Sequence, residues 1–431
     1  MTYPEALKYL ESFINYEKIP AYPYKESLKL ERVRDFLDTI DNPQDSLRCI
    51  HIAGTKGKGS TCAFIAYILR QAGYKVGLYT SPHLSDFRER IRVLHPRTKE
   101  LKNLRTDFEG MISEKELSDF VDRLKPAIEK YNNDSKYGPL SFFEVYTAVA
   151  FAYFKEKKVD LAVLETGLGG RLDATNVVRA LVCAITPISY EHTQKLGSTL
   201  AEIAAEKCGI IKIPGSIVIS APQEKEAMEV IRNRCERIGA KLFEVGKDIE
   251  YHKLKSNLIG EHQLINAAVA VGAIEALSSY GVKVSIDEIK NGLRNTVWPG
   301  RCEVVSKDPL IILDGAQNIA SAQVLKKAIK ENFKYKKLIL VLGISKDKDI
   351  LGICREVDEL ADEVILTRAD NPRATEPKVL AGYFKGKPAH ITKDIKEAKI
   401  MAQRIAKKGD LILVTGSLFV VGEFRDEVTR A

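Results

Sequence analysis

A short segment rich in glycine and lysine has the residue types that bind phosphate groups. It comprises Gly54, Thr55, Lys56, Gly57, Lys58, Gly59, Ser60 and Thr61. A glycine-rich turn between a strand and a helix leaves backbone N–H groups and the positive end of the helix dipole for an anion. Lys58 can reach the β and γ phosphates of a nucleotide, and a hydroxyl of Ser60 or Thr61 can approach its metal ion. The segment therefore predicts an ATP-binding phosphate loop.

The loop departs from the general phosphate-loop pattern at one position. That pattern places Ser or Thr directly after Gly-Lys, whereas Gly59 separates Lys58 from Ser60 here. This spacing argues against an ordinary kinase or GTPase. The alternative interpretation is a glycine turn that only caps a helix, and the agreement of strand, glycines, lysine and helix argues against it.

The elements around the loop predict an α/β fold, because short β-branched runs alternate with longer amphipathic runs. Strands are expected at residues 49–53, 75–79, 161–164 and 181–185, and helices at residues 60–72, 142–155, 260–280 and 287–295. Further strands are expected at residues 310–313, 338–342, 364–366 and 411–414. The Trp298-Pro299-Gly300 break separates two domains, residues 1–297 and 298–431, each with a mainly parallel sheet.

Composition narrows the class of protein. A chain of 431 residues with 45% hydrophobic and 29% charged residues is typical of two or three globular domains. The mild excess of Lys and Arg (66) over Asp and Glu (58) forms no basic block, so we expect anionic small molecules rather than nucleic acid as partners. Seven scattered cysteines without a CxxC pair predict reduced thiols. Without a signal-peptide pattern or a long apolar run, the sequence predicts a cytoplasmic protein with no membrane partner.

Further motifs follow along nearly the whole chain. They are Thr80-Ser81-Pro82-His83-Leu84, Phe142-Phe143-Glu144, the run from Glu165 to Asn176, Glu206-Lys207-Cys208-Gly209, Trp298-Pro299-Gly300-Arg301, Asp314-Gly315-Ala316 and Gly416-Ser417-Leu418-Phe419. In this order, together with the phosphate loop, they resemble the Mur-ligase superfamily and, within it, the folylpolyglutamate synthase and dihydrofolate synthase branch. The resemblance implies a central ATP-binding domain with the phosphate loop and pterin site, and a smaller Rossmann-like glutamate ligase domain.

The resemblance also implies a metal site. Its magnesium ligands would be Ser81, Glu165, His192 and Lys207, holding two Mg²⁺ ions with Lys207 carbamylated. Magnesium prefers hard oxygen ligands, and carbamylation converts a repelled ammonium into a carboxylate-like ligand. The catalytic set carried over is Lys58, His192 and Lys207. Each proposed metal ligand also has an ordinary interpretation. These are a surface carboxylate for Glu165, a hydrogen-bonded loop histidine for His192, a turn serine for Ser81, and a helix lysine paired with an acidic neighbour for Lys207.

The remaining site residues are likewise implied by the resemblance. Beyond the phosphate loop, the nucleotide contacts would be Asn266, Arg301 and Asp314. The pterin would be held by Ser141, Phe142, Phe143, Glu144 and Leu172. Two adjacent aromatic residues suit a flat ring, although core packing is the alternative for both.

The reaction implied is an ATP-dependent acid–amino-acid ligation. The γ-phosphate of ATP would pass to a carboxylate of dihydropteroate or a reduced folate, and the amine of L-glutamate would attack the acyl phosphate, in a monomeric enzyme. Dihydrofolate synthesis, polyglutamate extension, or both stay open at this point. The alternatives are another amino-acid ligase of the superfamily, against which the 53 residues before Gly54 and the Ser-Pro-His-Leu motif argue, and a non-catalytic ATP-binding module.

The chain departs from the family pattern at several positions. Gln317 replaces the usual histidine after Asp-Gly-Ala, so a titratable contact is lost. Glu191 replaces an aspartate before His192, and Lys56 replaces an asparagine, where an added cation is expected to tighten ATP binding. The charged stretch from Arg92 to Glu109 is expected to be a surface loop near the pterin entrance.

Overall fold

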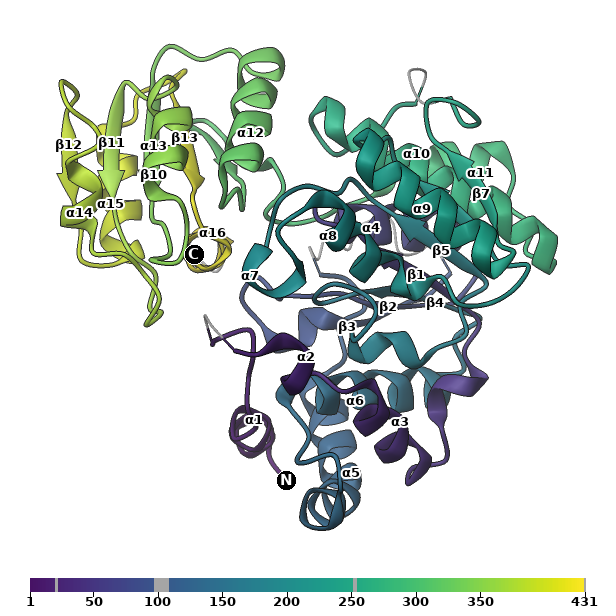
Figure 1. The fold of residues 1–431 in the computed structure, drawn as a ribbon. Helices are drawn as coiled ribbons and strands as arrows, with labels where there is room; N and C mark the ends of the chain where they lie inside the picture. The colour runs from purple at the N-terminus through teal and green to yellow at the C-terminus, as the bar shows by residue number, and fades with distance from the viewer. Residues whose placement is uncertain (20–21, 97–107, 251–253, 430–431) are drawn as a thin grey trace. The chain divides into compact units, whose positions relative to one another are not determined.

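The computed structural model describes residues 1–19, 22–96, 108–250 and 254–429. The chain divides into two compact units, coloured from purple to green and from green to yellow in Figure 1. Unit 1 comprises Met1–His83, Phe87–Asn257 and Gln263–Thr296, and unit 2 comprises Leu84–Asp86, Leu258–His262 and Val297–Ala431. The domain division after residue 297 stays a prediction; the compact units assign two short earlier segments to the second unit.

Unit 1 is built on a seven-stranded sheet in the order β3-β2-β4-β1-β5-β6-β7. Its strands are β1 (Cys49–Ala53), β2 (Val76–Tyr79), β3 (Ile91–Leu94), β4 (Leu161–Glu165), β5 (Val182–Ile185), β6 (Ile217–Ser220) and β7 (Lys241–Glu244). Only the pairing of β2 with β3 is antiparallel among these strands. The central strands β4, β1 and β5 are buried along their whole length, which explains their uninterrupted apolar runs.

Different helices cover the two faces of this sheet. The helices of unit 1 are α1 (Tyr3–Glu11), α2 (Tyr24–Ser27), α3 (Leu30–Asp38), α4 (Lys58–Gln71), α5 (Glu114–Asp134), α6 (Phe142–Lys157), α7 (Thr193–Leu196), α8 (Leu200–Lys207), α9 (Lys225–Ile238), α10 (Glu261–Ala276, whose first two residues belong to unit 2) and α11 (Ile286–Asn295). Figure 1 shows α3, α5 and α6 on one face and α4, α10 and α11 on the other. The sheet is therefore a middle layer between two layers of helices.

Unit 2 contains a six-stranded sheet in the order β12-β11-β10-β13-β9-β8. Its elements are β8 (Glu303–Lys307), β9 (Leu310–Leu313), α12 (Ile319–Asn332), β10 (Leu338–Leu342), α13 (Ile350–Asp358), β11 (Glu363–Leu366), α14 (Pro377–Ala381), β12 (Ala389–Ile391), α15 (Ile395–Ile405), β13 (Leu411–Thr415) and α16 (Leu418–Thr429). All neighbouring strands are parallel except β8 and β9. The predicted α/β fold with two mainly parallel sheets is confirmed.

The expectation of a surface loop from Arg92 to Glu109 is wrong for its first residues, which belong to a buried strand, whereas Glu109 lies in a partly exposed turn. Arg92 lies within β3, is fully buried, and donates from Nε to the Glu109 carbonyl at 2.8 Å. The Glu109 carboxylate accepts from both terminal nitrogens of Arg70, at 2.7 and 2.8 Å. The sequence did not indicate this short strand, because the charged Arg92 interrupts the apolar run by which buried strands are recognised. Residues 97–107 of this stretch lie outside the described residues.

Two further expectations concern the whole chain. All seven cysteines are buried and none forms a disulfide, as the sequence predicts. Across the described ranges, no helix combines the length and the apolarity that crossing a membrane requires.

The helix that follows the phosphate loop is held by an unusually close helix contact. Helix α11 packs against α4 at Gly292, where a Cβ atom would lie 2.5 Å from the Ile68 Cα. Such an approach leaves no space for any side chain at Gly292. The contact fixes α4 against α11. It therefore also fixes the phosphate loop, which lies at the N-terminus of α4.

We expect Gly292→Ala to lower the free energy of unfolding by about 1–3 kcal/mol, because the added methyl forces α11 away from α4. Chemical denaturation followed by circular dichroism measures the loss. Gly382→Ala is a matched control: Gly382 has helical dihedral angles and the nearest atom to an added methyl would be 3.8 Å away, so a change within about 0.5–1 kcal/mol is expected. Equal stability of the two variants would contradict the close contact.

Candidate active site

The phosphate loop joins β1 to α4 and requires glycine at two positions. Gly54 has a φ of 150°, and a Cβ there would lie 1.9 Å from the Thr186 Oγ1. Gly57 has a φ of 84°, and a Cβ there would lie 2.1 Å from the Asn266 Oδ1. Both positions combine a backbone conformation that favours glycine with a close neighbour. The loop is therefore pressed between the end of β5 and helix α10.

The start of α4 leaves donors for an anion. The N–H of Thr61 donates to the Gly57 carbonyl at 2.9 Å, which is the first hydrogen bond of the helical ladder. The N–H groups of residues 58–60 precede that bond and have no intrahelical acceptor by helix geometry. Together with the helix dipole and the Lys58 ammonium, these N–H groups make up the expected phosphate cradle.

The loops after β4 and β5 flank this cradle, because both strands pair with β1 in register. Ile52 of β1 lies opposite Glu165 of β4 and opposite Ala184 of β5. The N–H of Thr166 donates to the Ile52 carbonyl at 3.0 Å, and the N–H of Thr186 donates to the Ala53 carbonyl at 2.9 Å. The segments that follow β1, β4 and β5 thus leave the sheet at the same edge, which is where ligands of doubly wound sheets bind.

Three hydroxyl groups at this edge of the sheet are buried and have unused hydrogen-bonding capacity within the described ranges. The Oγ atoms of Thr61, Thr166 and Ser189 are buried without a hydrogen-bond partner in the part of the chain that the structure describes. Buried polar groups nearly always have partners in folded proteins. Three such groups, one on α4 and one in each flanking loop, suit a bound anion or hydrated cation.

The proposed metal ligands lie around the same strand ends. Glu165 ends β4, is 5% exposed, and its Oε2 accepts from the Ser81 N–H at 3.1 Å. His192 has a left-handed φ of 52° and caps α7, leaving its side chain exposed. Ser81 and Glu165 are thus brought together directly.

Lys207, the fourth proposed ligand, ends α8 and is buried. Its Nζ donates to the Gly54 carbonyl at 2.8 Å. Very close backbone contacts place it there, since a Cβ on Gly170 would lie 2.6 Å from the Lys207 carbonyl oxygen. Burial, and then the neighbouring Lys58, lower the pKa of Lys207 to about 7. Near neutral pH a substantial fraction of this amine is uncharged, which is the form that carbamylation requires.

These side chains fit a magnesium site only in part as they stand. Glu165 supplies a hard oxygen donor, and the orphaned hydroxyl of Thr61 lies one turn into α4. An ammonium at Lys207 would repel a cation, so this position fits magnesium as a carbamate. Among the described residues, no cluster of three or more His, Cys, Asp or Glu side chains could hold a metal ion.

Of the other expected nucleotide contacts, Asn266 belongs to unit 1, whereas Arg301 and Asp314 belong to unit 2. Asn266 lies on α10, is buried, and donates from Nδ2 to the Gln263 Oε1 at 3.0 Å while its side chain abuts Gly57. In unit 2, Asp314 follows β9 and accepts from the N–H groups of Cys302 and Ala316, at 2.8 and 2.9 Å. Burial raises the pKa of Asp314, against the opposing effect of Arg301.

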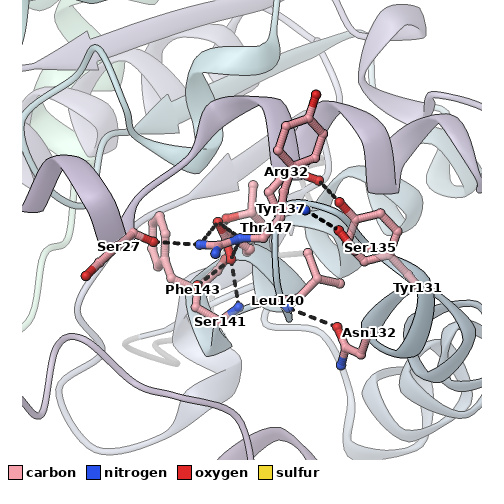
Figure 2. Close-up of polar contacts among 11 residues, drawn as sticks. Ser27, Arg32, Tyr131, Asn132, Ser135, Tyr137, Leu140, Ser141, Phe143 and Thr147 are labelled. Atoms are coloured by element: carbon pink, nitrogen blue, oxygen red, sulfur yellow. Dashed lines mark hydrogen bonds and ion pairs between the residues drawn. The ribbon is translucent and has the colours of Figure 1, made fainter.

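Two of the expected pterin residues belong to a buried polar network. Glu144 Oε2 accepts from the N–H and the hydroxyl of Ser141, at 2.7 and 2.8 Å. The Arg32 guanidinium donates to the same carboxylate, with its shortest contact at 2.7 Å, and also to the Ser27 carbonyl at 2.8 Å. Figure 2 shows this Arg32 contact with Ser27 and the neighbouring bond from Tyr131. The Glu144 carboxylate therefore already has partners, and the sequence contained no local signal for Arg32, 112 residues away.

The two aromatic residues of this motif have different surroundings. Phe142 is 1% exposed and stacks on Tyr146, with ring centroids 5.4 Å apart, so core packing describes its position. Phe143 is half-buried and covers Gly167, where a Cβ would lie 2.7 Å from its ring. Leu172, also half-buried, follows the same glycine-rich segment. Phe143 and Leu172 are thus the members of the set that border this segment.

Lys56 and Glu191, which both depart from the family pattern, form an ion pair with each other. Lys56 Nζ lies 2.7 Å from Glu191 Oε1. Burial alone would raise the pKa of Glu191, but Lys56 and its other cationic neighbours bring it down to about 2. Lys56 is thus paired with Glu191, and the expectation that it tightens ATP binding stays a prediction. In unit 2, Gln317 stands just before α12, with its N–H donating to the Ser321 hydroxyl at 3.1 Å.

We expect Glu144→Gln to lower the free energy of unfolding by about 3–5 kcal/mol, because it leaves the buried Arg32 guanidinium without its counter-charge. The matched control is Glu156→Gln, which removes the exposed ion pair with Arg123 and should cost at most about 1 kcal/mol. Denaturant titration of both variants gives the comparison. Equal losses would mean that the buried pair contributes no more than a surface pair.

Comparison with known proteins agrees with this geometry. Residues 300–418 match the family described as Mur ligase, glutamate ligase domain. Dihydrofolate synthase/folylpolyglutamate synthase of Bacillus subtilis is 33% identical over 420 residues, covering 92% of this chain and 94% of that protein. A probable bifunctional folylpolyglutamate synthase/dihydropteroate synthase of Haloferax volcanii is 34% identical over all of this chain, which spans 51% of its length.

Solved structures show the same fold. Escherichia coli FolC in complex with DHPP and ADP superimposes with a TM-score of 0.84 at 29% identity, covering 100% of this chain and 98% of that one. Agreement in sequence and structure over nearly the full length identifies the family. The chain belongs to the folylpolyglutamate synthase/dihydrofolate synthase family of the Mur ligase superfamily.

Proposed function

We propose that this protein is an ATP-dependent ligase that adds L-glutamate to a carboxylate of dihydropteroate or a reduced folate. The observation that carries the proposal is the phosphate cradle at the start of α4, with Glu165 and Lys207 beside it at one edge of the sheet. Family membership supports the choice of substrates. A cytoplasmic location and a monomeric state stay predictions.

The reaction proceeds in two steps. The carboxylate oxygen of the folate attacks the γ-phosphorus of ATP, which forms an acyl phosphate and releases ADP. The glutamate amine then attacks the acyl carbon, an amide bond forms, a proton leaves the nitrogen, and phosphate departs. Lys58 and the N–H groups of residues 58–60 stabilise the charge on the transferring oxygens, while Asn266 holds the loop from the opposite side.

Magnesium completes the proposed site. The ion neutralises phosphate charge and orients the γ-phosphoryl group when it is bound. Ser81, Glu165, His192 and carbamylated Lys207 are its proposed ligands, sufficient for two ions together with phosphate oxygens and water. Phe143 and Leu172 are the proposed contacts of the pterin ring, with Ser141, Phe142 and Glu144 forming the floor beneath it. Arg301 and Asp314 are proposed as further nucleotide contacts.

The decisive experiment is a substrate-omission assay on the purified protein. Phosphate should be released from ATP and Mg²⁺ only when L-glutamate and either dihydropteroate or tetrahydrofolate are both present. Product analysis with each acceptor distinguishes dihydrofolate synthesis from polyglutamate extension. Phosphate release without a pterin would favour another ligase of the superfamily, and no release under any condition would favour a non-catalytic ATP-binding protein.

Lys58→Ala should lower kcat by about 10²–10³-fold, because one preorganised cation that meets the transferring phosphoryl group is lost. Steady-state assays measure the loss, and an unchanged circular dichroism spectrum establishes that the fold is intact. The exposed Lys130 on α5 provides the control, since Lys130→Ala should leave turnover unchanged. Near-normal turnover of Lys58→Ala would contradict the placement of the triphosphate.

Carbamylation of Lys207 predicts a carbonyl signal in ¹³C NMR after incubation with ¹³C-bicarbonate, and its loss in Lys207→Arg. Lys212 is the matched control, because burial also lowers its pKa, to about 8, and Lys212→Arg should keep the signal. A signal that survives Lys207→Arg would place the modification elsewhere. This readout does not depend on turnover.

A further inference from the structure

We propose that Lys56 and Glu191 form a positioning pair that fixes the phosphate loop to the segment carrying His192, and that Lys56 is not itself a phosphate ligand. The inference rests on the proposed nucleotide site at residues 54–61. It assigns a role in the ligase reaction to two residues that contact the reacting groups only through others.

The pair connects two loops at the same edge of the sheet. Lys56 lies in the loop between β1 and α4, and Glu191 lies 135 residues later, in the segment after β5. Their charged atoms are 2.7 Å apart, and the side chains are 32% and 19% exposed. A pair that is mostly shielded from water is held more strongly than the exposed ion pairs of the surface.

Backbone contacts join the same two segments next to the pair. The N–H groups of Thr55 and Lys56 both donate to the Pro187 carbonyl, at 3.0 and 3.2 Å. The Thr55 hydroxyl accepts from the Ser189 N–H at 3.1 Å and donates to the Ser189 carbonyl at 3.2 Å. These bonds fix residues 187–189 against the loop. The Lys56–Glu191 contact extends the connection by two residues, to the neighbour of His192.

The charge balance explains why Lys56 is assigned a positioning role. Glu191 is engaged by Lys56, so the two residues together bring no net charge to the phosphate loop. Lys58, on the first turn of α4, supplies the cation that the transferred phosphoryl group meets. Removal of Lys56 alone would leave a carboxylate beside bound phosphates, and removal of both charges would restore neutrality. A direct phosphate ligand would behave differently, since its loss could not be compensated at Glu191.

A double-mutant cycle with Lys56→Met and Glu191→Gln separates the two roles. The probe is ADP, titrated calorimetrically into the parent protein, both single variants and the double variant. We expect Lys56→Met to weaken ADP binding about tenfold through repulsion, and the double variant to return to within about threefold of the parent protein. We also expect kcat of the double variant to fall about tenfold or more while its KM for ATP stays near the parent value, because the connection nearest to His192 is lost.

Two outcomes would overturn the inference. Binding of ADP by the double variant that is as weak as binding by Lys56→Met would identify Lys56 as a direct phosphate ligand. A double variant with the parent kcat would show that the pair positions nothing. The exposed Arg123–Glu156 pair, neutralised in the same way, is the control and should change neither ADP binding nor kcat. A parent protein that binds no ADP would instead contradict the proposed function, which keeps the two failures distinct.

Discussion

The structure of unit 1 depends on the parallel register of β4, β1 and β5. Because these strands end at the same level, the loops that follow them touch one another through backbone hydrogen bonds. The phosphate loop can then keep the first N–H groups of α4 for a ligand, while its own carbonyls and glycines pack against neighbours. A slip of one residue in the pairing of β4 with β1 would turn Glu165 to the opposite face of the sheet and separate it from the cradle.

Electrostatics at this edge are governed by three lysines in a partly buried space. Lys58 begins α4, Lys56 is paired with Glu191, and burial and the proximity of Lys58 lower the pKa of Lys207. The loop therefore carries less positive charge than its composition indicates. A site arranged in this way can bind a highly charged nucleotide and still bring a second anion, the acceptor carboxylate, close to it.

The Arg32–Glu144 pair illustrates a different use of charge. Glu144 and Ser141 begin α6, and Arg32 of α3 reaches the same carboxylate from a helix more than one hundred residues earlier. The pair connects two helices on one face of the sheet. Two residues of a motif that the sequence associates with the substrate thus belong to a buried polar network within unit 1.

The amino-acid sequence by itself determined the elements and the motifs of this protein. The buried strands β1, β4, β5, β10 and β13 were readable because parallel strands covered on both faces form uninterrupted apolar runs. The phosphate loop was readable because its glycines, lysine and helix start are consecutive. Short or half-exposed strands such as β3 and β7 could not be predicted from the sequence, because Arg92 and the polar residues of β7 interrupt the apolar runs of these strands.

Only the tertiary structure decided how distant charges meet. It paired Lys56 with Glu191, Arg32 with Glu144, and the Lys207 ammonium with the Gly54 carbonyl. No periodicity encodes these contacts, because each joins residues that lie far apart along the chain and depends on the strand order and on close backbone approaches. The physical reason is that local sequence governs backbone conformation, whereas the protonation and the pairing of a buried charge depend on every group that folding brings around it.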